Sequence, residues 1–118
     1  MHKIIIVLPA YNAEKTIIKT ISEIPKGIAY KIIVVDDYSS DNTFDIIKNI
    51  PNIISKKHGS NLGYGANQKT CYDLALDEGA DIIIMLHPDY QYDPKIITHM
   101  SKMVSDGTFD VVLGTRIT

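Results

Sequence analysis

Five short apolar runs, all rich in isoleucine and valine, constrain the fold of this chain more than any other feature. They are continuous rather than alternating, and they occupy residues 4–8, 32–35, 53–54, 82–86 and 111–113. A continuous run of this length is typical of a parallel strand covered on both faces, because neither of its faces then meets water. The runs therefore predict a sheet buried between two layers.

Segments with the apolar spacing of amphipathic helices separate these runs. Helices are predicted over residues 13–24, 41–50, 66–78 and 94–104. Asn12 is a plausible N-cap for the first, and Gly79 is a natural C-terminal glycine for the third. The alternation predicts the α/β class, with a doubly wound, mostly parallel sheet of right-handed βαβ units.

Length and composition exclude several classes of protein. The 118 residues fit a single domain spanning 1–118, and no apolar run reaches the roughly 20 residues of a membrane span. The net charge of −2, with no basic cluster larger than Lys56-Lys57, argues against a nucleic-acid partner. Cys71 is the only cysteine, which excludes an internal disulfide and favours a reducing compartment such as the cytoplasm.

Four polar clusters fall near the predicted strand ends, where open α/β sheets bind their ligands. Their sequences are PAYNAE (9–14), DDYSSDNT (36–43), NLGYGAN (61–67) and HPDYQYDP (87–94). Pro9 and Asn12 are equally well explained as a strand exit and a helix cap, and Asp41 is better explained as a cap. Asp36 and Asp37 repel each other, so a positive or hydrogen-bonding partner is expected beside them.

The two glycines of the third cluster, Gly63 and Gly65, allow close backbone approach at a helix N-terminus, which suits a phosphate. The fourth cluster has the pattern of a metal site, because His87, Asp89 and Gln91 project to the same side of an extended chain. Carboxylate and amide oxygens suit Mg²⁺ or Mn²⁺, and an imidazole favours Mn²⁺. A strand-end packing role explains His87 equally well.

The four clusters, in this order and spacing, resemble family 2 glycosyltransferases of the GT-A fold. They are most similar to the branch with the polyprenyl- and dolichyl-phosphate sugar transferases, and the closing VVLGTR (111–116) is similar to the strand that follows in that family. The resemblance covers nearly the whole chain. It implies a Rossmann-like half that binds a UDP- or GDP-sugar, a divalent cation (Mn²⁺ or Mg²⁺), and inverting transfer of a hexose to a lipid-phosphate or glycan acceptor.

The resemblance also implies roles for individual residues. The donor-binding positions would be Pro9, Tyr11, Asn12, Glu14, Asp36, Asp37, Asn61, Gly63, Gly65 and Asp89. Asp37 would hydrogen-bond the base. Asp89 matches the second acid of the family's Asp-x-Asp motif and would hold the metal with Gln91, while His87 replaces the first acid and is a third candidate ligand. The catalytic residues stay unknown, because the family's base is expected after Thr118.

The chain is therefore expected to be the N-terminal, donor-binding portion of a longer transferase that is poorly active by itself. The acceptor implied by the resemblance is a polyprenyl phosphate, so we expect a cytoplasmic protein that is peripheral at the inner face of the membrane. A homodimer is a further expectation, formed through an exposed face of the sheet.

Three other functions stay open at this stage. A catalytically inactive nucleotide-sugar-binding module is favoured by His87 in place of an acid. A receiver-like signalling domain has a similar size and alternation, but its acid pair would follow the first strand rather than the second. A nucleotidyltransferase would carry a glycine-rich loop with a basic residue directly after the first strand, and this chain shows none there.

Overall fold

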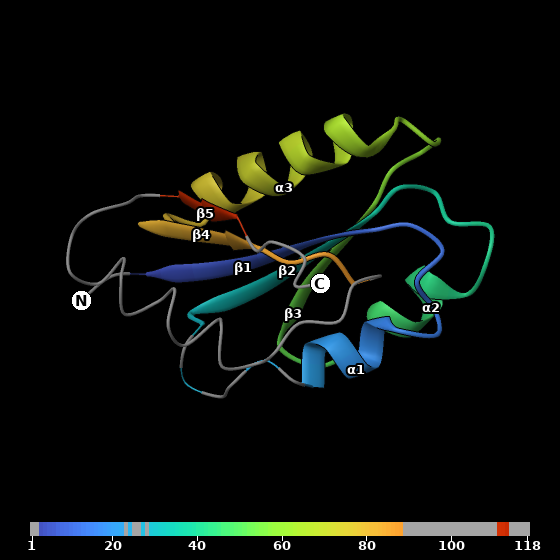
Figure 1. Ribbon diagram of the computed structural model, residues 1–118, viewed down its shortest axis with the longest axis horizontal. Coiled ribbons are helices and arrows are strands. Elements are labelled where there is room, and N and C mark those ends of the chain that lie inside the picture. The colour runs from blue at the N-terminus through green and yellow to red at the C-terminus, as the bar shows by residue number, and fades with distance from the viewer. Residues whose placement is uncertain (1–2, 23, 25–26, 28, 89–110, 114–118) are drawn as a thin grey trace.

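The computed structural model describes residues 3–22, 24, 27 and 29–88, together with the backbone of 111–113 (Figure 1). The elements follow in the order β1 (Ile4–Ala10), α1 (Ile17–Ser22), β2 (Lys31–Asp36), α2 (Thr43–Ile47), β3 (Ile53–Lys57), α3 (Tyr64–Asp77), β4 (Ile82–Met85) and β5 (Val111–Leu113). The helix predicted over 94–104 lies outside the described residues.

The strands form one sheet in the order β3-β2-β1-β4-β5, and every neighbouring pair is parallel. This confirms the predicted doubly wound α/β fold. The chain places β2 and β3 on one side of β1 and then crosses to β4 on the other side, which creates a topological switch point beside β1. The order also rules out the receiver-like alternative, whose first strand lies between the second and the third.

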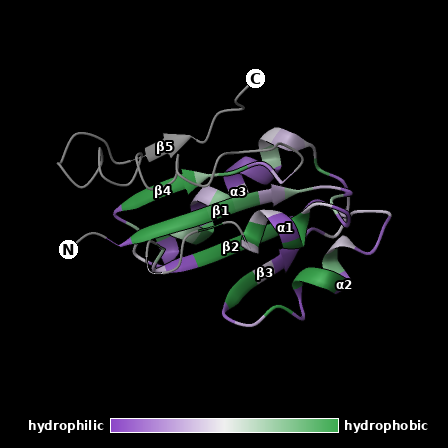
Figure 2. Ribbon diagram, turned by 60° about the horizontal axis from the view of Figure 1, so that its bottom comes forward, coloured by the Kyte–Doolittle hydropathy of each residue, from purple (hydrophilic) through white to green (hydrophobic). Residues whose placement is uncertain are grey.

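The sheet is covered on both faces, as the continuous apolar runs predicted. Alternate residues of β1 point to opposite sides, so that Ile5 and Val7 pack with Cys71 and Ala75 of α3. On the other face, the core is completed by α1 and α2, which contribute residues such as Ile17 and Ile47 (Figures 1 and 2). All seven residues of β1 are buried, which identifies it as the centre of the core.

The helix boundaries differ from those predicted. Helix α1 begins at Ile17 instead of residue 13, because residues 14–16 form a turn that follows a left-handed Asn12 with a φ of 50°. Asn12 is therefore not the N-cap of α1, and that interpretation was wrong. Helix α2 is shorter than expected, whereas α3 begins at Tyr64, two residues earlier than predicted.

The predicted C-terminal glycine of α3 is confirmed. Gly79 has a φ of 79°, and its N–H donates to the Leu76 carbonyl at 3.0 Å. The next N–H, that of Ala80, donates to the Ala75 carbonyl at 3.1 Å, which completes a Schellman motif. None of the helices among the described residues combines the length and the apolarity that crossing a membrane requires.

Candidate functional site

The parallel register brings the polar clusters to one edge of the sheet. Ala10, at the carboxyl end of β1, is opposite Asp36 of β2, and Asp36 is opposite Lys57 of β3. The loops that follow these strands must therefore leave the sheet side by side. This is the edge at which open α/β sheets bind ligands.

The loop after β1 and the loop after β2 are joined by hydrogen bonds in both directions. The Asn12 N–H donates to Ser39 Oγ at 2.8 Å, and the Ala13 N–H donates to Thr43 Oγ1 at 2.8 Å. In return, the Ser40 N–H donates to Asn12 Oδ1 at 2.9 Å. The Asn12 side chain thus connects the two loops instead of capping a helix.

Asp36 stabilises this connection between the two loops through Ser39. It is fully buried, and its carboxylate accepts hydrogen bonds from both the N–H and the hydroxyl of Ser39. Ser39 is the residue that holds the Asn12 N–H, so the acid anchors the first loop through the second. Pro9 lies inside β1 rather than at its exit, and it is buried.

Asp41 is not the N-cap of α2, which is Asn42, but from the preceding position its carboxylate holds the first N–H of that helix. Its Oδ1 accepts the N–H of Thr43, the first residue of α2, at 3.0 Å, and its Oδ2 accepts the Glu14 N–H at 3.3 Å. Burial raises the pKa of Asp41, but the hydrogen bonds from Thr43 and Glu14 outweigh it and leave the pKa below its usual value. The carboxylate is therefore charged at neutral pH.

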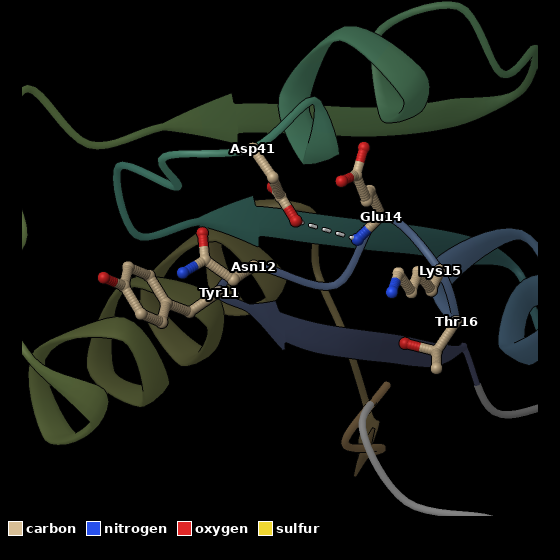
Figure 3. A pocket seen from close by; sticks show the side chains of 6 residues that line it. All are labelled: Tyr11, Asn12, Glu14, Lys15, Thr16 and Asp41. Carbon is tan, nitrogen blue, oxygen red and sulfur yellow. Dashed lines mark hydrogen bonds between the residues drawn. The ribbon is translucent and has the colours of Figure 1, made fainter.

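Between the two loops lies an open pocket of about 400 Å³ (Figure 3). Its lining residues are Tyr11, Asn12, Glu14, Lys15, Thr16 and Asp41. A half-exposed tyrosine ring beside carboxylates and a lysine suits a planar, polar ligand, and the volume falls in the range of small-molecule sites. Three lining residues belong to the predicted donor-binding set, whereas Lys15, Thr16 and Asp41 do not.

Asp37 faces a third loop, which leads from β3 into α3. It is 3% exposed, and its Oδ1 accepts the Leu62 N–H at 2.9 Å while its Oδ2 accepts the Gly63 N–H at 3.0 Å. His58 Nδ1 lies 2.8 Å from the same Oδ1. The partner expected beside the acid pair is therefore present, and it includes a histidine that sequence reasoning did not select.

These contacts determine the ionisation of Asp37. Burial raises its pKa, but the hydrogen bonds from His58, Leu62 and Gly63 outweigh that effect and lower the pKa below its usual value. Because both oxygens accept hydrogen bonds from the chain itself, the direct contact of Asp37 with a base stays a prediction.

Two glycines at the start of α3 differ: Gly63 has a backbone conformation that requires glycine, and Gly65 faces open space. Gly63 has a φ of 98° and a ψ of 165°, a conformation that is essentially restricted to glycine. At Gly65, by contrast, no described atom outside its chain neighbours and the backbone of its own helix lies within 4 Å of an added Cβ. Asn61 is exposed in the same loop. The first turn of α3 is thus accessible to a ligand from the side of Gly65.

Asn67 ties this helix to the sheet. The buried side chain donates to the Val35 carbonyl at 3.1 Å and to the Ala10 carbonyl at 3.4 Å, at the carboxyl ends of β2 and β1. Sequence reasoning missed this residue. The available signal was its spacing, because it lies four residues before Cys71 and eight before Ala75 on the buried face of α3.

His87, two residues beyond the end of β4, contacts the first residue of α3. The Tyr64 hydroxyl lies 2.9 Å from His87 Nε2, and the two ring centroids are 5.4 Å apart. Asp89, Gln91 and Asp93 lie outside the described residues. Within the part of the chain that is described, no three His, Cys, Asp or Glu side chains are grouped so that they could hold a metal ion. Metal binding by His87, Asp89 and Gln91 stays a prediction.

Comparison with known proteins agrees with the resemblance drawn from the motifs. The family model described as "Glycosyl transferase family 2" matches residues 5–118. The chain is 30% identical to a UDP-N-acetylglucosamine–dolichyl-phosphate N-acetylglucosaminyltransferase of Methanococcus voltae, over 97% of this chain and 52% of that protein. The chain thus spans about half the length of this relative.

Two solved structures show the same GT-A-like fold. The chain is similar to S. aureus TarS 1-349 in complex with UDP, with a TM-score of 0.71 and 19% identity over 88% of this chain and 32% of that one. It is also similar to glucosyl-3-phosphoglycerate synthase from Mycobacterium tuberculosis, with a TM-score of 0.58 and 25% identity over 74% and 33% of the two chains. That structure contains Mn²⁺ and UDP.

Proposed function

Because the chain belongs to glycosyl transferase family 2, we propose that it forms the donor-binding part of an enzyme that transfers a hexose from a UDP- or GDP-sugar to a lipid-phosphate or glycan acceptor. The observation that carries the proposal is the pocket between the loops after β1 and β2. It lies at the edge of the sheet where this class of fold binds nucleotides, and it contains an aromatic ring beside hydrogen-bonding groups.

The pocket residues suggest a division of roles. The exposed ring of Tyr11 offers a surface for the base, and Glu14 and Asn12 offer hydrogen bonds to the base and the ribose. The loop before α3, with Asn61 and Gly63, would lie along the nucleotide, and Gly65 would let the backbone approach the diphosphate.

A divalent cation would be held by Asp89 and Gln91, with His87 as a further candidate ligand. When bound, Mn²⁺ or Mg²⁺ neutralises charge on the leaving nucleoside diphosphate. The support is the donor chemistry of these residues and the presence of Mn²⁺ and UDP in a similar solved structure.

The reaction would be a single displacement with inversion. A bond forms between the acceptor oxygen and the anomeric carbon while the bond from that carbon to the diphosphate breaks, and the electron pair leaves with the nucleoside diphosphate. A hydroxyl acceptor requires a base to take its proton, and we expect that base after Thr118. An acceptor that is already an anionic phosphate has less need of one.

Similarity to a dolichyl-phosphate transferase supports a polyprenyl phosphate as the acceptor. Such a lipid substrate would bring the enzyme to the inner face of the membrane as a peripheral cytoplasmic protein. A homodimer is part of the same proposal, and its formation is measurable by light scattering.

Calorimetry with UDP-, GDP- and dTDP-sugars, with and without Mn²⁺, tests the proposed donor. We expect one nucleotide to bind, and we expect Tyr11→Ala to weaken it. Lys48→Ala is a matched control, because Lys48 is exposed and pairs only with Asp45 on α2 among the described residues, at 3.0 Å. A folded protein that binds none of these nucleotides would refute the proposal.

A second candidate is a nucleotide-sugar-binding module without catalysis. The observation that favours it is His87, which replaces an acid of the family motif and packs against Tyr64. Release of free sugar from the bound donor distinguishes the two candidates, because a module that only binds leaves the sugar–phosphate bond intact.

A further inference from the structure

We propose that His58 is a positioning residue of the donor site. It holds Asp37 in the orientation in which this carboxylate fixes the loop before α3, and it thereby preorganises the site for the nucleotide. The inference rests on the proposed function, but the arrangement that it describes is present in the free protein.

The ring of His58 is fixed at both of its nitrogens. The residue follows β3 directly, is 6% exposed, and donates its backbone N–H to the Asp36 carbonyl at 2.9 Å. This bond places the ring beside Asp37, with Nδ1 at 2.8 Å from Oδ1. At the other end, Nε2 lies 2.9 Å from Thr70 Oγ1 on α3. His58 therefore links the end of β2 to the body of α3.

The hydrogen-bond donors and acceptors define how the ring is held. The Asp37 carboxylate only accepts, so His58 Nδ1 carries the proton of this hydrogen bond. Nε2 lies 2.9 Å from the Thr70 hydroxyl, which can act as donor or acceptor toward it. A buried histidine thus donates to a buried carboxylate at the root of the loop.

The loop depends on that carboxylate. The backbone N–H groups of Leu62 and Gly63 both donate to Asp37. Gly63 has no side chain that could fix the loop through other contacts. Without His58, the buried carboxylate loses a hydrogen-bond donor and must turn toward solvent or take up a proton. Either change weakens the acceptor of the two N–H groups and loosens the start of α3.

Two amide substitutions of His58 test the contacts of the two ring nitrogens separately. His58→Asn places an amide nitrogen where Nδ1 lies, so it keeps the bond to Asp37 and loses the one to Thr70. His58→Gln reaches the position of Nε2, so it keeps Thr70 and loses Asp37. We expect His58→Gln to bind the UDP- or GDP-sugar about tenfold more weakly than the wild type or worse, and His58→Asn to remain within a few-fold.

The core variant Ile33→Val is the control for general destabilisation, because Ile33 is buried under α3 away from the loop. We expect it to bind the nucleotide-sugar like the wild type even where its melting temperature is as low as that of His58→Gln.

Hydrogen exchange without nucleotide tests the same idea independently. The amides of Leu62 and Gly63 are expected to lose protection in His58→Gln and to keep it in His58→Asn. Nitrogen NMR of the wild type is expected to show a proton on His58 Nδ1, the nitrogen that faces the Asp37 carboxylate. Equal affinity and equal amide protection in the two folded amide variants overturn the inference and leave the proposed function intact. A wild-type protein that binds no nucleotide overturns the proposed function instead.

Discussion

Replacement of Gly65 by alanine separates stability from ligand binding at the first turn of α3. Gly65 is the second residue of this helix, and no described atom outside its chain neighbours and the helix's own backbone lies within 4 Å of the methyl group that alanine would add. The free protein should therefore accept the methyl group without strain. If the nucleotide approaches the backbone here, as proposed, the same methyl group would occupy part of its place.

Gly65→Ala is expected to raise the stability of the fold and to lower its affinity for the nucleotide. Alanine in place of glycine within a helix stabilises the folded state by about 0.5–1 kcal/mol, because glycine loses more backbone entropy on folding. For a domain of this size, such a gain raises the melting temperature by a few degrees. A methyl group that displaces a diphosphate oxygen from its hydrogen bonds should weaken binding by about 1.4 kcal/mol or more, which is tenfold in the dissociation constant.

Thermal unfolding and calorimetry on the same preparation measure both quantities. Gly59→Ala is the matched control, because its added Cβ also has no described atom within 4 Å but lies outside the helix. It should leave nucleotide affinity unchanged. A Gly65→Ala protein that is more stable and binds the nucleotide-sugar as tightly as the wild type would refute a close approach of the ligand to Gly65.

Three further predictions follow from the site. Asp89→Ala should abolish the enhancement of UDP or GDP binding by Mn²⁺ in a folded protein, and calorimetry that finds the enhancement unchanged would remove Asp89 from the metal site. Because the pKa of Asp41 is lower in the folded than in the unfolded protein, its carboxylate stabilises the fold above pH 3.8, and this contribution is lost as the pH falls through the pKa of the folded state. The stability of Asp41→Asn, measured by circular dichroism, should therefore fall less steeply at acid pH than that of the wild type. Identical acid dependence of the two proteins would contradict this. Asn67→Ala should lower the free energy of unfolding by about 1–3 kcal/mol in urea titrations, because its buried hydrogen bonds to the Val35 and Ala10 carbonyls are lost; an unchanged midpoint would show that these bonds add nothing to stability.

The layered fold was predictable from sequence because it follows from local patterns. A continuous apolar run requires cover on both faces, and the helical stripes between the runs supply that cover. The strand order was not predictable in the same way. The five runs are chemically alike, so nothing local distinguishes a β1 between β2 and β4 from a β1 between β2 and β3.

The candidate site was predictable only in part. Tyr11, Asn12 and Glu14 were named because their polar cluster follows a predicted strand and resembles a family motif; they line the pocket, and their contact with a donor stays a prediction. His58 was missed because it comes after two lysines at the end of a strand with only two apolar residues, which suggests an exposed position. It is buried because the pairing of β2 with β3 places it beside Asp37, and that contact spans 21 residues.

The buried acids of the sheet edge share one property that bears on how a donor is bound. Asp36 holds Ser39, and Asp37 holds the loop before α3, so each acid stabilises a loop in the free protein. Loops ordered in the free protein lose less conformational entropy when a nucleotide binds. If the proposed donor binds here, the residues left exposed around the pocket, Tyr11 and Glu14 among them, would contact the base, and the buried acids would also act on affinity through the shape of the loops.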